Sequence, residues 1–194
     1  MKNLVFVCCF ISLCLFISCV TADNNSQNFA IENILNRKSV RKYSDKKVEQ
    51  EKIDTILKCA MAAPSAVNKQ PWEFLVITDK EKLEKIAEIA PNASYAKNSQ
   101  VTIIVCGNKN LSEKFWLQDC CAVSENILLA TEALGLGAVW CFVYPSDERI
   151  LAIKQLFNLP EEIVPVNIIP IGYPFTKEEP KQKYNPEKIH VNNW

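Results

Sequence analysis

Apolar and polar positions between residues 29 and 171 follow two alternating patterns. Stretches with apolar residues three and four positions apart predict amphipathic helices, and short continuous apolar runs predict buried strands. The pattern predicts helices at 29–36, 49–63, 78–90, 116–134 and 146–157. It predicts strands at 74–77, 101–106, 138–143 and 164–171, and an extended segment at 39–43. Strands separated by helices ordinarily indicate a parallel α/β sheet, although the pattern alone gives no strand direction.

Local signals mark the ends of several of these elements. Pro64 ends the second helix, and Gly135 and Gly137 follow the longest one. The last strand contains Pro165 and Pro170, which lack the N–H group that a strand ladder needs. We therefore expect an edge position, a bulge or a local break in that strand.

The N-terminus has the composition of an export signal. Residues 4–20 are uncharged and nearly all apolar, and Lys2 is the only basic residue before them. Two processing routes stay open: cleavage after Ala22, or a lipobox-like sequence at 16–19 that would make Cys19 a lipidated N-terminus. The lipoprotein route is slightly favoured. The uncharged run also reaches the lower limit for a retained membrane anchor.

This signal predicts an exported protein of a bacterium, either periplasmic or anchored to a membrane as a lipoprotein. Membrane attachment is expected only through the N-terminus. After the signal at 1–22, the polar residues 23–28 predict a tether, and 29–194 predict one folded domain with a sizeable core.

Composition argues against several classes of function. Lys plus Arg and Asp plus Glu both number 22 and are interspersed, so no broad field favours nucleic acid. The single histidine and the absence of a CxxC pair argue against a metal site or a Cys–His nucleophile. Five of the nine cysteines lie in the domain, an odd number whose apolar settings predict small buried side chains rather than disulfides. These five are Cys59, Cys106, Cys120, Cys121 and Cys141.

A basic segment follows the first predicted helix. In extended backbone, alternate side chains share a face, so Arg37, Ser39 and Arg41 would point one way. Two guanidinium groups and a hydroxyl suit a phosphate or an electron-rich ring edge. The alternative is a solvated basic patch on an edge strand.

A stiff loop lies between the second helix and the first strand. Pro64 and Pro71 restrict both of its ends. Its polar side chains, on Ser65, Asn68 and Gln70, could bond a planar heterocycle that presents donors and acceptors. The alternative is a capped turn beside a buried Trp72.

The C-terminal segment changes character after Gly172. It is polar and proline-containing, but Ile189, Val191 and Trp194 near its end predict that it wraps around a partner. Lys181 and Lys183 could close over a phosphate if this tail packs near Arg37. The Gly-x-Gly at 135–137 follows a helix and precedes a strand, so it predicts a helix C-cap rather than a dinucleotide loop.

The chain resembles the FMN-dependent nitroreductases over nearly all of residues 29–194. The resemblance rests on the order and spacing of "RKSVRKY", "APSAVNKQPWEFLVI", "ALGLGAVW", "LPEEIVPVNIIPIGYP", "EEPKQKY" and "KIHVNNW". It implies an α+β, nitroreductase-like fold with a central mixed, mainly antiparallel sheet flanked by helices. It also implies a homodimer whose C-terminal tail extends onto the partner.

The same resemblance implies an FMN site. Arg37 and Ser39 would bind the phosphate and ribityl end, and Arg41 would approach N1 and the C2 oxygen of the ring. The resemblance assigns the remaining cofactor-binding positions to Pro64, Ser65, Ala66, Asn68 and Gln70 from the opposite chain, to Trp140, Cys141 and Phe142 beneath the ring, and to Lys181 and Lys183 at the phosphate. Two departures stand out: the family often has a glycine shortly after the tryptophan, and arginine is common where this chain has Lys183.

The implied activity is hydride transfer from NAD(P)H through flavin N5 to a small-molecule electron acceptor, such as a nitroaromatic or a quinone, by a ping-pong mechanism. No catalytic side chain is required, because the cofactor carries the chemistry. The alternatives are related reductive dehalogenation or flavin-destroying chemistry, an exported flavin carrier or sensor without turnover, and a structural lipoprotein. The short connection at 108–114 argues against the first of these.

Overall fold

The computed structural model describes residues 25–194; the predicted export signal and Cys19 lie outside the described residues. At its centre is a sheet with strand order β1-β2-β5-β3, in which β4 also pairs with β5. The strands are β1 Trp72–Ile77, β2 Val101–Asn108, β3 Gly137–Ala138, β4 Cys141–Phe142 and β5 Ile163–Gly172. Every pairing between them is antiparallel, and a parallel bridge joins Ser39 to Ala138. The mixed, mainly antiparallel sheet implied by the resemblance is therefore confirmed, and the parallel sheet that the alternation of elements indicates is not found.

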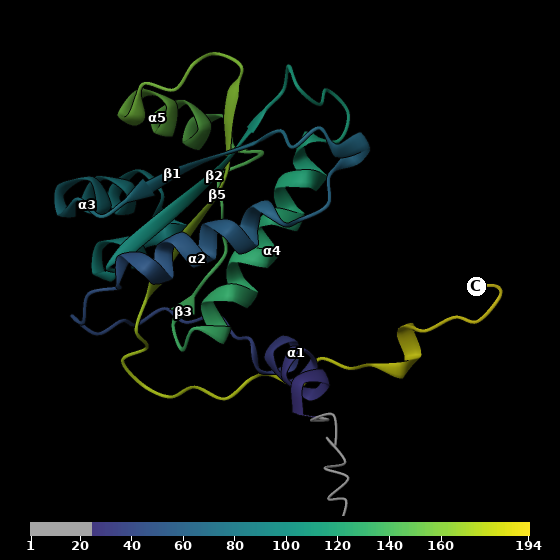
Figure 1. Cartoon of the computed structure of the whole chain (residues 1–194). Helices are drawn as coiled ribbons and strands as arrows, with labels where there is room; N and C mark the ends of the chain where they lie inside the picture. Colours follow the sequence, from purple (N-terminus) through teal and green to yellow (C-terminus); the bar gives the residue numbers. More distant parts are fainter. Residues whose placement is uncertain (1–24) are drawn as a thin grey trace, which may run out of the picture.

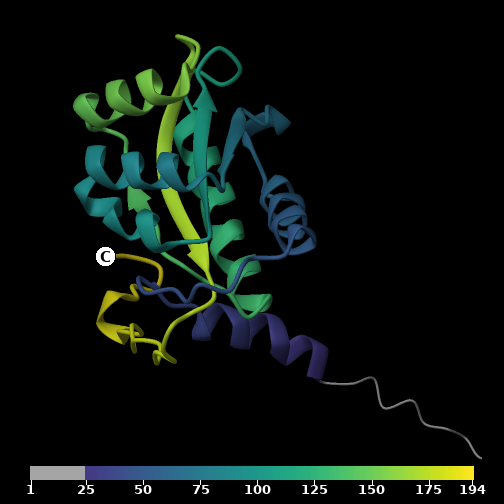
Figure 2. The ribbon, with the colours of Figure 1, turned by 90° about the vertical axis from the view of Figure 1, so that its left-hand side faces the viewer.

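Helices cover both faces of this sheet, which makes a three-layer α+β domain (Figures 1 and 2). The α-helices are α1 Asn25–Asn36, α2 Gln50–Met61, α3 Lys80–Ile89, α4 Trp116–Ala133 and α5 Asp147–Phe157. The 3-10 helices are η1 Ala66–Asn68, η2 Pro91–Asn98 and η3 Pro186–Lys188. Helices α2 and α4 pack on one face, whereas α3, η2 and α5 pack on the other.

The core consists of two clusters, one on each face of the sheet, and alternate side chains of β2 and β5 belong to one cluster or the other. Ile103 and Val105 belong to the cluster under α2 and α4, and Ile104 and Cys106 belong to the cluster under α3 and α5. Because both faces are covered, every residue of β2 from Val101 to Gly107 is buried. This explains why the strand appears in the sequence as an unbroken apolar run.

The two prolines of β5 do not lie at an edge. The edge position is wrong, because β5 pairs with β2 on one side and with β3 and β4 on the other. The predicted bulge is confirmed: the ladder with β2 shifts between Val105 and Cys106, and Cys106 faces Pro165. Ala138 of β3 pairs with Ile171, and Cys141 of β4 pairs with Ile168. Pro170 therefore lies opposite the gap between β3 and β4. The single strand predicted at 138–143 is therefore split where its partner lacks a donor.

Several predicted boundaries need correction. Helix α1 begins at Asn25, inside the segment predicted as a tether. The helix predicted from Thr78 is capped by Asp79, whose side chain accepts from the Lys82 N–H. The 3-10 helix η2 was not predicted, since its residues show no regular apolar period. Within residues 25–194, no helix combines the length and the apolar character that crossing a membrane would require.

The tail after β5 leaves the body of the domain (Figure 1). All residues from 181 to 194 are exposed, and Trp194 is 99% exposed. The Trp194 ring stacks only on His190 of the same tail, with 4.2 Å between the ring centroids, and does not pack on the body of the domain.

Candidate functional site

A small basic cavity is lined by charged residues from the two ends of the domain. The segment after α1 lies against β3, because the Val40 N–H donates to the Ala138 carbonyl at 2.9 Å and the Val40 side chain is buried. Val40 packs against Gly137, where a Cβ would come within 2.6 Å of it. Neighbouring side chains therefore turn away from the core, as the predicted alternation requires. The cavity has a volume of about 130 Å³ and is lined by Arg37, Lys38, Ser39, Arg41, Glu178, Glu179, Lys181 and Lys183.

Positive charge predominates in this cavity, with five cationic side chains against two carboxylates. Arg37 is fixed by its Nε atom, which lies 3.4 Å from Glu125 Oε1 on α4. Lys38 is bound to Glu132 at 2.9 Å, so its charge is already paired. Arg41 lies over the Tyr95 ring, 5.7 Å from its centroid. The arrangement suits a compact anion such as a phosphate group.

The three residues predicted to lie beneath a ring form a short segment around β4. The Trp140 indole donates to Asn167 Oδ1 at 2.5 Å. Cys141 points into the core on the α3 and α5 side, and burial raises the pKa of its thiol to about 11. Phe142 is 58% exposed, and its carbonyl accepts from Asn92 Nδ2 at 2.9 Å. Only the backbone of Cys141 can therefore face a ligand there.

A second, larger cavity of about 550 Å³ lies beside Phe142. Its walls are mainly apolar and aromatic, with Arg149, Ser146 and Asn167 as polar members. The Arg149 guanidinium also approaches the Phe142 carbonyl, at 3.4 Å. The cavity is completed by Leu117, Cys121, Phe142, Val143, Tyr144, Pro145 and Val166. Its size and lining suit a planar aromatic group.

The stiff loop does not line the basic cavity of the chain. Pro64, Ser65, Ala66, Asn68 and Gln70 are absent from that cavity's lining. The loop is instead closed on itself, because the Gln70 N–H donates to Ser65 Oγ and Gln70 Nε2 donates to Asn68 Oδ1, both at 2.9 Å. Trp72 is buried in the core, as the structural alternative predicted.

Sequence reasoning missed the polar residues buried around these cavities. Asn167 is fully buried in β5 and donates to Ser124 Oγ at 2.8 Å. A polar residue inside the apolar run "VPVNIIPI" was a usable signal for it. Asp119 of α4, which accepts from the Ala66 N–H at 3.0 Å, had no comparable signal in its helix.

The cysteines offer no metal or redox centre in the described part of the chain. All five domain thiols are free, and residues 25–194 contain no group of three or more metal-ligating side chains. Cys106, Cys120 and Cys141 are buried, as predicted. Cys59 is exposed, so the prediction of a buried side chain is wrong for this residue.

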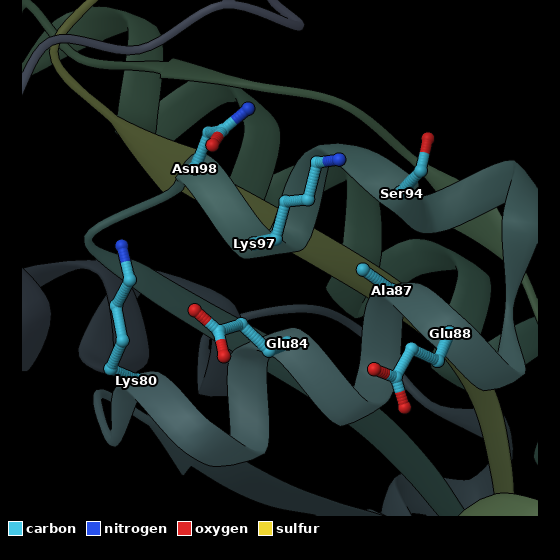
Figure 3. A pocket seen from close by; sticks show the side chains of 7 residues that line it. All are labelled: Lys80, Glu84, Ala87, Glu88, Ser94, Lys97 and Asn98. Atoms are coloured by element: carbon cyan, nitrogen blue, oxygen red, sulfur yellow. The ribbon is translucent and has the colours of Figure 1, made fainter.

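A further groove lies between α3 and η2, on the other side of the domain from α4. Figure 3 shows Lys80 and Glu84 projecting from α3 and Lys97 from η2. Its lysines and glutamates balance in number, and none of the predicted cofactor residues lines it. This groove offers no net charge with which to attract an ionic ligand.

The fold and the two cavities define a class of protein: a three-layer α+β domain with one cavity that suits an anion and another that suits a planar aromatic group. Comparison with known proteins then identifies the family. The Nitroreductase family model matches residues 34–100 and 91–173, and the chain belongs to this oxidoreductase family.

Individual relatives agree with this assignment. A Methanothermobacter thermautotrophicus protein provisionally named NADH dehydrogenase/NAD(P)H nitroreductase is 45% identical over 84% of this chain and 87% of its own length. A crystal structure from Parabacteroides distasonis with the same provisional name is 50% identical, with a TM-score of 0.84 over 85% of this chain and 98% of that one. An FMN-dependent nitroreductase from Clostridium difficile is 31% identical, with a TM-score of 0.81 over 84% and 99% of the two chains.

Proposed function

We propose that the protein is an NAD(P)H-dependent oxidoreductase that holds FMN between two copies of the chain. The observation that carries the proposal is the convergence of Arg37, Ser39, Arg41, Lys181 and Lys183 on one cavity. The bridge between Tyr43 and Pro174 brings the two ends of the sequence together, and the excess positive charge of the residues that meet there matches a phosphomonoester. Relatives named FMN-dependent nitroreductase and FMN reductase support the choice of anion.

The residues present fit this cofactor at both ends. Arg37 and Ser39 would hold the phosphate and ribityl portion, with Lys181 and Lys183 closing over the phosphate from the tail. Arg41 would face N1 and the C2 oxygen, where a fixed cation favours the negative charge that reduction brings. The backbone at Trp140, Cys141 and Phe142 would support the ring. FMN bound by these residues would supply the hydride chemistry at N5, between NAD(P)H and the acceptor, in a proposed ping-pong cycle.

The acceptor is proposed to be a small planar molecule such as a nitroaromatic or a quinone. The apolar cavity beside Phe142 supports this choice, because its walls are aromatic and aliphatic and its volume of about 550 Å³ suits an aromatic ring. The exposed Phe142 ring could stack on such a molecule.

The homodimer is supported by apolar side chains that the single chain leaves exposed. On α1, Phe29 is 58% and Leu35 68% exposed, and the apolar end of the tail is equally accessible. In the proposed dimer the tail extends onto the partner, and Pro64, Ser65, Ala66, Asn68 and Gln70 reach the cofactor of the other subunit. A loop that is ordered yet absent from its own cavity is consistent with that role.

The test is a visible spectrum of purified residues 24–194, followed by anaerobic addition of NADH. A bound yellow chromophore that bleaches supports the enzyme. Colour without bleaching would instead favour a flavin carrier or sensor without turnover. A colourless protein that takes up no FMN on reconstitution would overturn the proposal.

We further propose export to the periplasm or to a bacterial membrane as a lipoprotein, on the evidence of residues 4–20 alone. Cys19→Ser in the full chain should move the protein from the membrane fraction to the soluble fraction. An unchanged distribution would reject lipidation at Cys19.

A further inference from the structure

The loop between α2 and β1 holds an unusual backbone. Val67, Asn68 and Gln70 have positive φ angles of 53°, 55° and 48°. For a β-branched residue such as Val67, this conformation is strongly disfavoured. Packing does not enforce it, because the Val67 side chain is 90% exposed. The conformation therefore depends on hydrogen bonds to the backbone of the loop.

Most hydrogen bonds of the loop bind it only to itself. Ser65 accepts from Asn68 and Gln70, and Ala66 accepts from Lys69. Such bonds close a turn but do not fix its position on the domain. Among the described residues, the one side-chain hydrogen bond from 64–70 to the rest of the domain joins the Ala66 N–H to Asp119 Oδ1, at 3.0 Å.

Asp119 is an unusual residue for this place. It lies in the first turn of α4 and is only 6% exposed, whereas aspartate is seldom this buried. Its second oxygen, Oδ2, is buried and has no hydrogen-bond partner among the described residues. The helix N-terminus offsets part of the cost of the charge, but a structural turn alone would not require a carboxylate.

We propose that Asp119 is a positioning residue, which fixes Ala66 and thereby keeps the strained loop in the shape that the partner's cofactor needs. The inference rests on the proposed function, because it takes this loop to face FMN across the dimer. Asp119 touches no cofactor itself; it acts through the Ala66 N–H.

The test compares FMN affinity in Asp119→Ala and Asp119→Asn, by quenching of flavin fluorescence. Asparagine retains an acceptor for the Ala66 N–H, so it should keep affinity within about threefold, whereas alanine should weaken binding about tenfold or more. The matched control is Asp147→Ala, an exposed aspartate in the first turn of α5, which should bind like the wild type. Equal binding by Asp119→Ala and the wild type, or equal losses in both Asp119 variants, would overturn the assignment.

Amide hydrogen exchange tests the same role without cofactor. In Asp119→Ala, residues 66–70 should exchange faster, while β2 should keep its protection and so report an intact fold. Adding Val67→Gly, which relieves the disfavoured φ, should reduce the effect of Asp119→Ala on the loop. If the wild type bound no FMN, the proposed function would fail, and unchanged exchange at 66–70 in Asp119→Ala would separately refute the positioning role.

Discussion

Trp140 and Asn167 are joined by a hydrogen bond from the indole N–H to Oδ1, which ties the segment between β3 and β4 to the centre of β5. Asn167 also donates to Ser124 Oγ, and Ser124 in turn donates to the Cys120 carbonyl on α4. A buried polar chain therefore links the sheet, α4 and the proposed ring-supporting segment. Because each of these side chains is hydrogen-bonded, the buried network fixes one arrangement of these elements.

Asn167→Ala should lower the free energy of unfolding by about 2–4 kcal/mol, because it leaves the Trp140 and Ser124 groups without their partner and opens a small void. Urea unfolding measured by far-ultraviolet circular dichroism would give the value. Gln118→Ala, an exposed amide on α4, is the control and should change stability by less than about 0.5 kcal/mol. A loss at Asn167 no larger than this would show that the network contributes little.

Arg37→Ala should weaken FMN retention by about 1.5–3 kcal/mol, the range for a charge-assisted contact. Its matched partner is Glu125→Gln, which removes the ion pair to Nε but leaves the guanidinium in place. FMN affinity in Glu125→Gln should equal or exceed that of the wild type. Flavin fluorescence would measure the FMN affinity of both variants. An equal loss of affinity in both would mean that Arg37→Ala weakens binding by removing the ion pair and not by removing a phosphate contact.

Lys38→Ala tests whether FMN binding depends on specific contacts or on the summed positive charge of the cavity. Lys38 lines the same cavity, but its Nζ is held by Glu132 at 2.9 Å. The variant should therefore retain FMN within about threefold of the wild type, because the Lys38 ammonium contacts Glu132 and is not free to contact the anion. A loss as large as that of Arg37→Ala would indicate that the cavity attracts FMN by its summed charge alone.

The sequence predicted those parts of the fold that local chemistry determines. The apolar period placed the five α-helices, and continuous apolar runs placed β1, β2 and β5. The signals that failed are the non-local ones. Pro165 and Pro170 predicted an irregularity, but only the pairing partners show that β5 is central, with a bulge at one proline and a gap in the neighbouring strand at the other.

The same distinction applies to the site. The alternation in 37–41 predicted that Arg37, Ser39 and Arg41 share a face, and the structure brings these three to one cavity with Lys181 and Lys183. Asp119 escaped prediction because its role depends on Ala66, which is 53 residues away in the chain. Periodicity within a helix cannot reveal a bond to a distant loop.

Gly107→Ala should destabilise the domain by about 1–3 kcal/mol through overpacking. An added Cβ would lie 2.4 Å from Cε3 of Trp116, a ring held edge-on against Tyr144. The double variant with Trp116→Phe should recover part of the lost stability, because the smaller phenyl ring leaves space where the six-membered ring of the indole lies. Thermal unfolding of the single and double variants provides the measurement, and simple additivity of the two losses would refute the clash.

Cys141 should make stability depend on pH in the alkaline range. Burial raises the pKa of its thiol from 9.0 to about 11, although the charge of Arg41 opposes the shift. Between these values the unfolded chain loses the thiol proton while the folded chain retains it, so stability falls as pH rises, by about 1.4 kcal/mol per pH unit. The stabilisation is complete below pH 9 and is lost as the pH approaches 11.

Cys141→Ala lacks this titration, so its deficit in unfolding free energy relative to the wild type should shrink by about 2 kcal/mol between pH 8 and 10.5. Val143→Ala, which opens a void at a neighbouring buried position without a titratable group, should keep a constant deficit in the same urea experiments. A Cys141→Ala deficit that also stayed constant would mean that the thiol ionises as readily in the folded protein as in the unfolded chain.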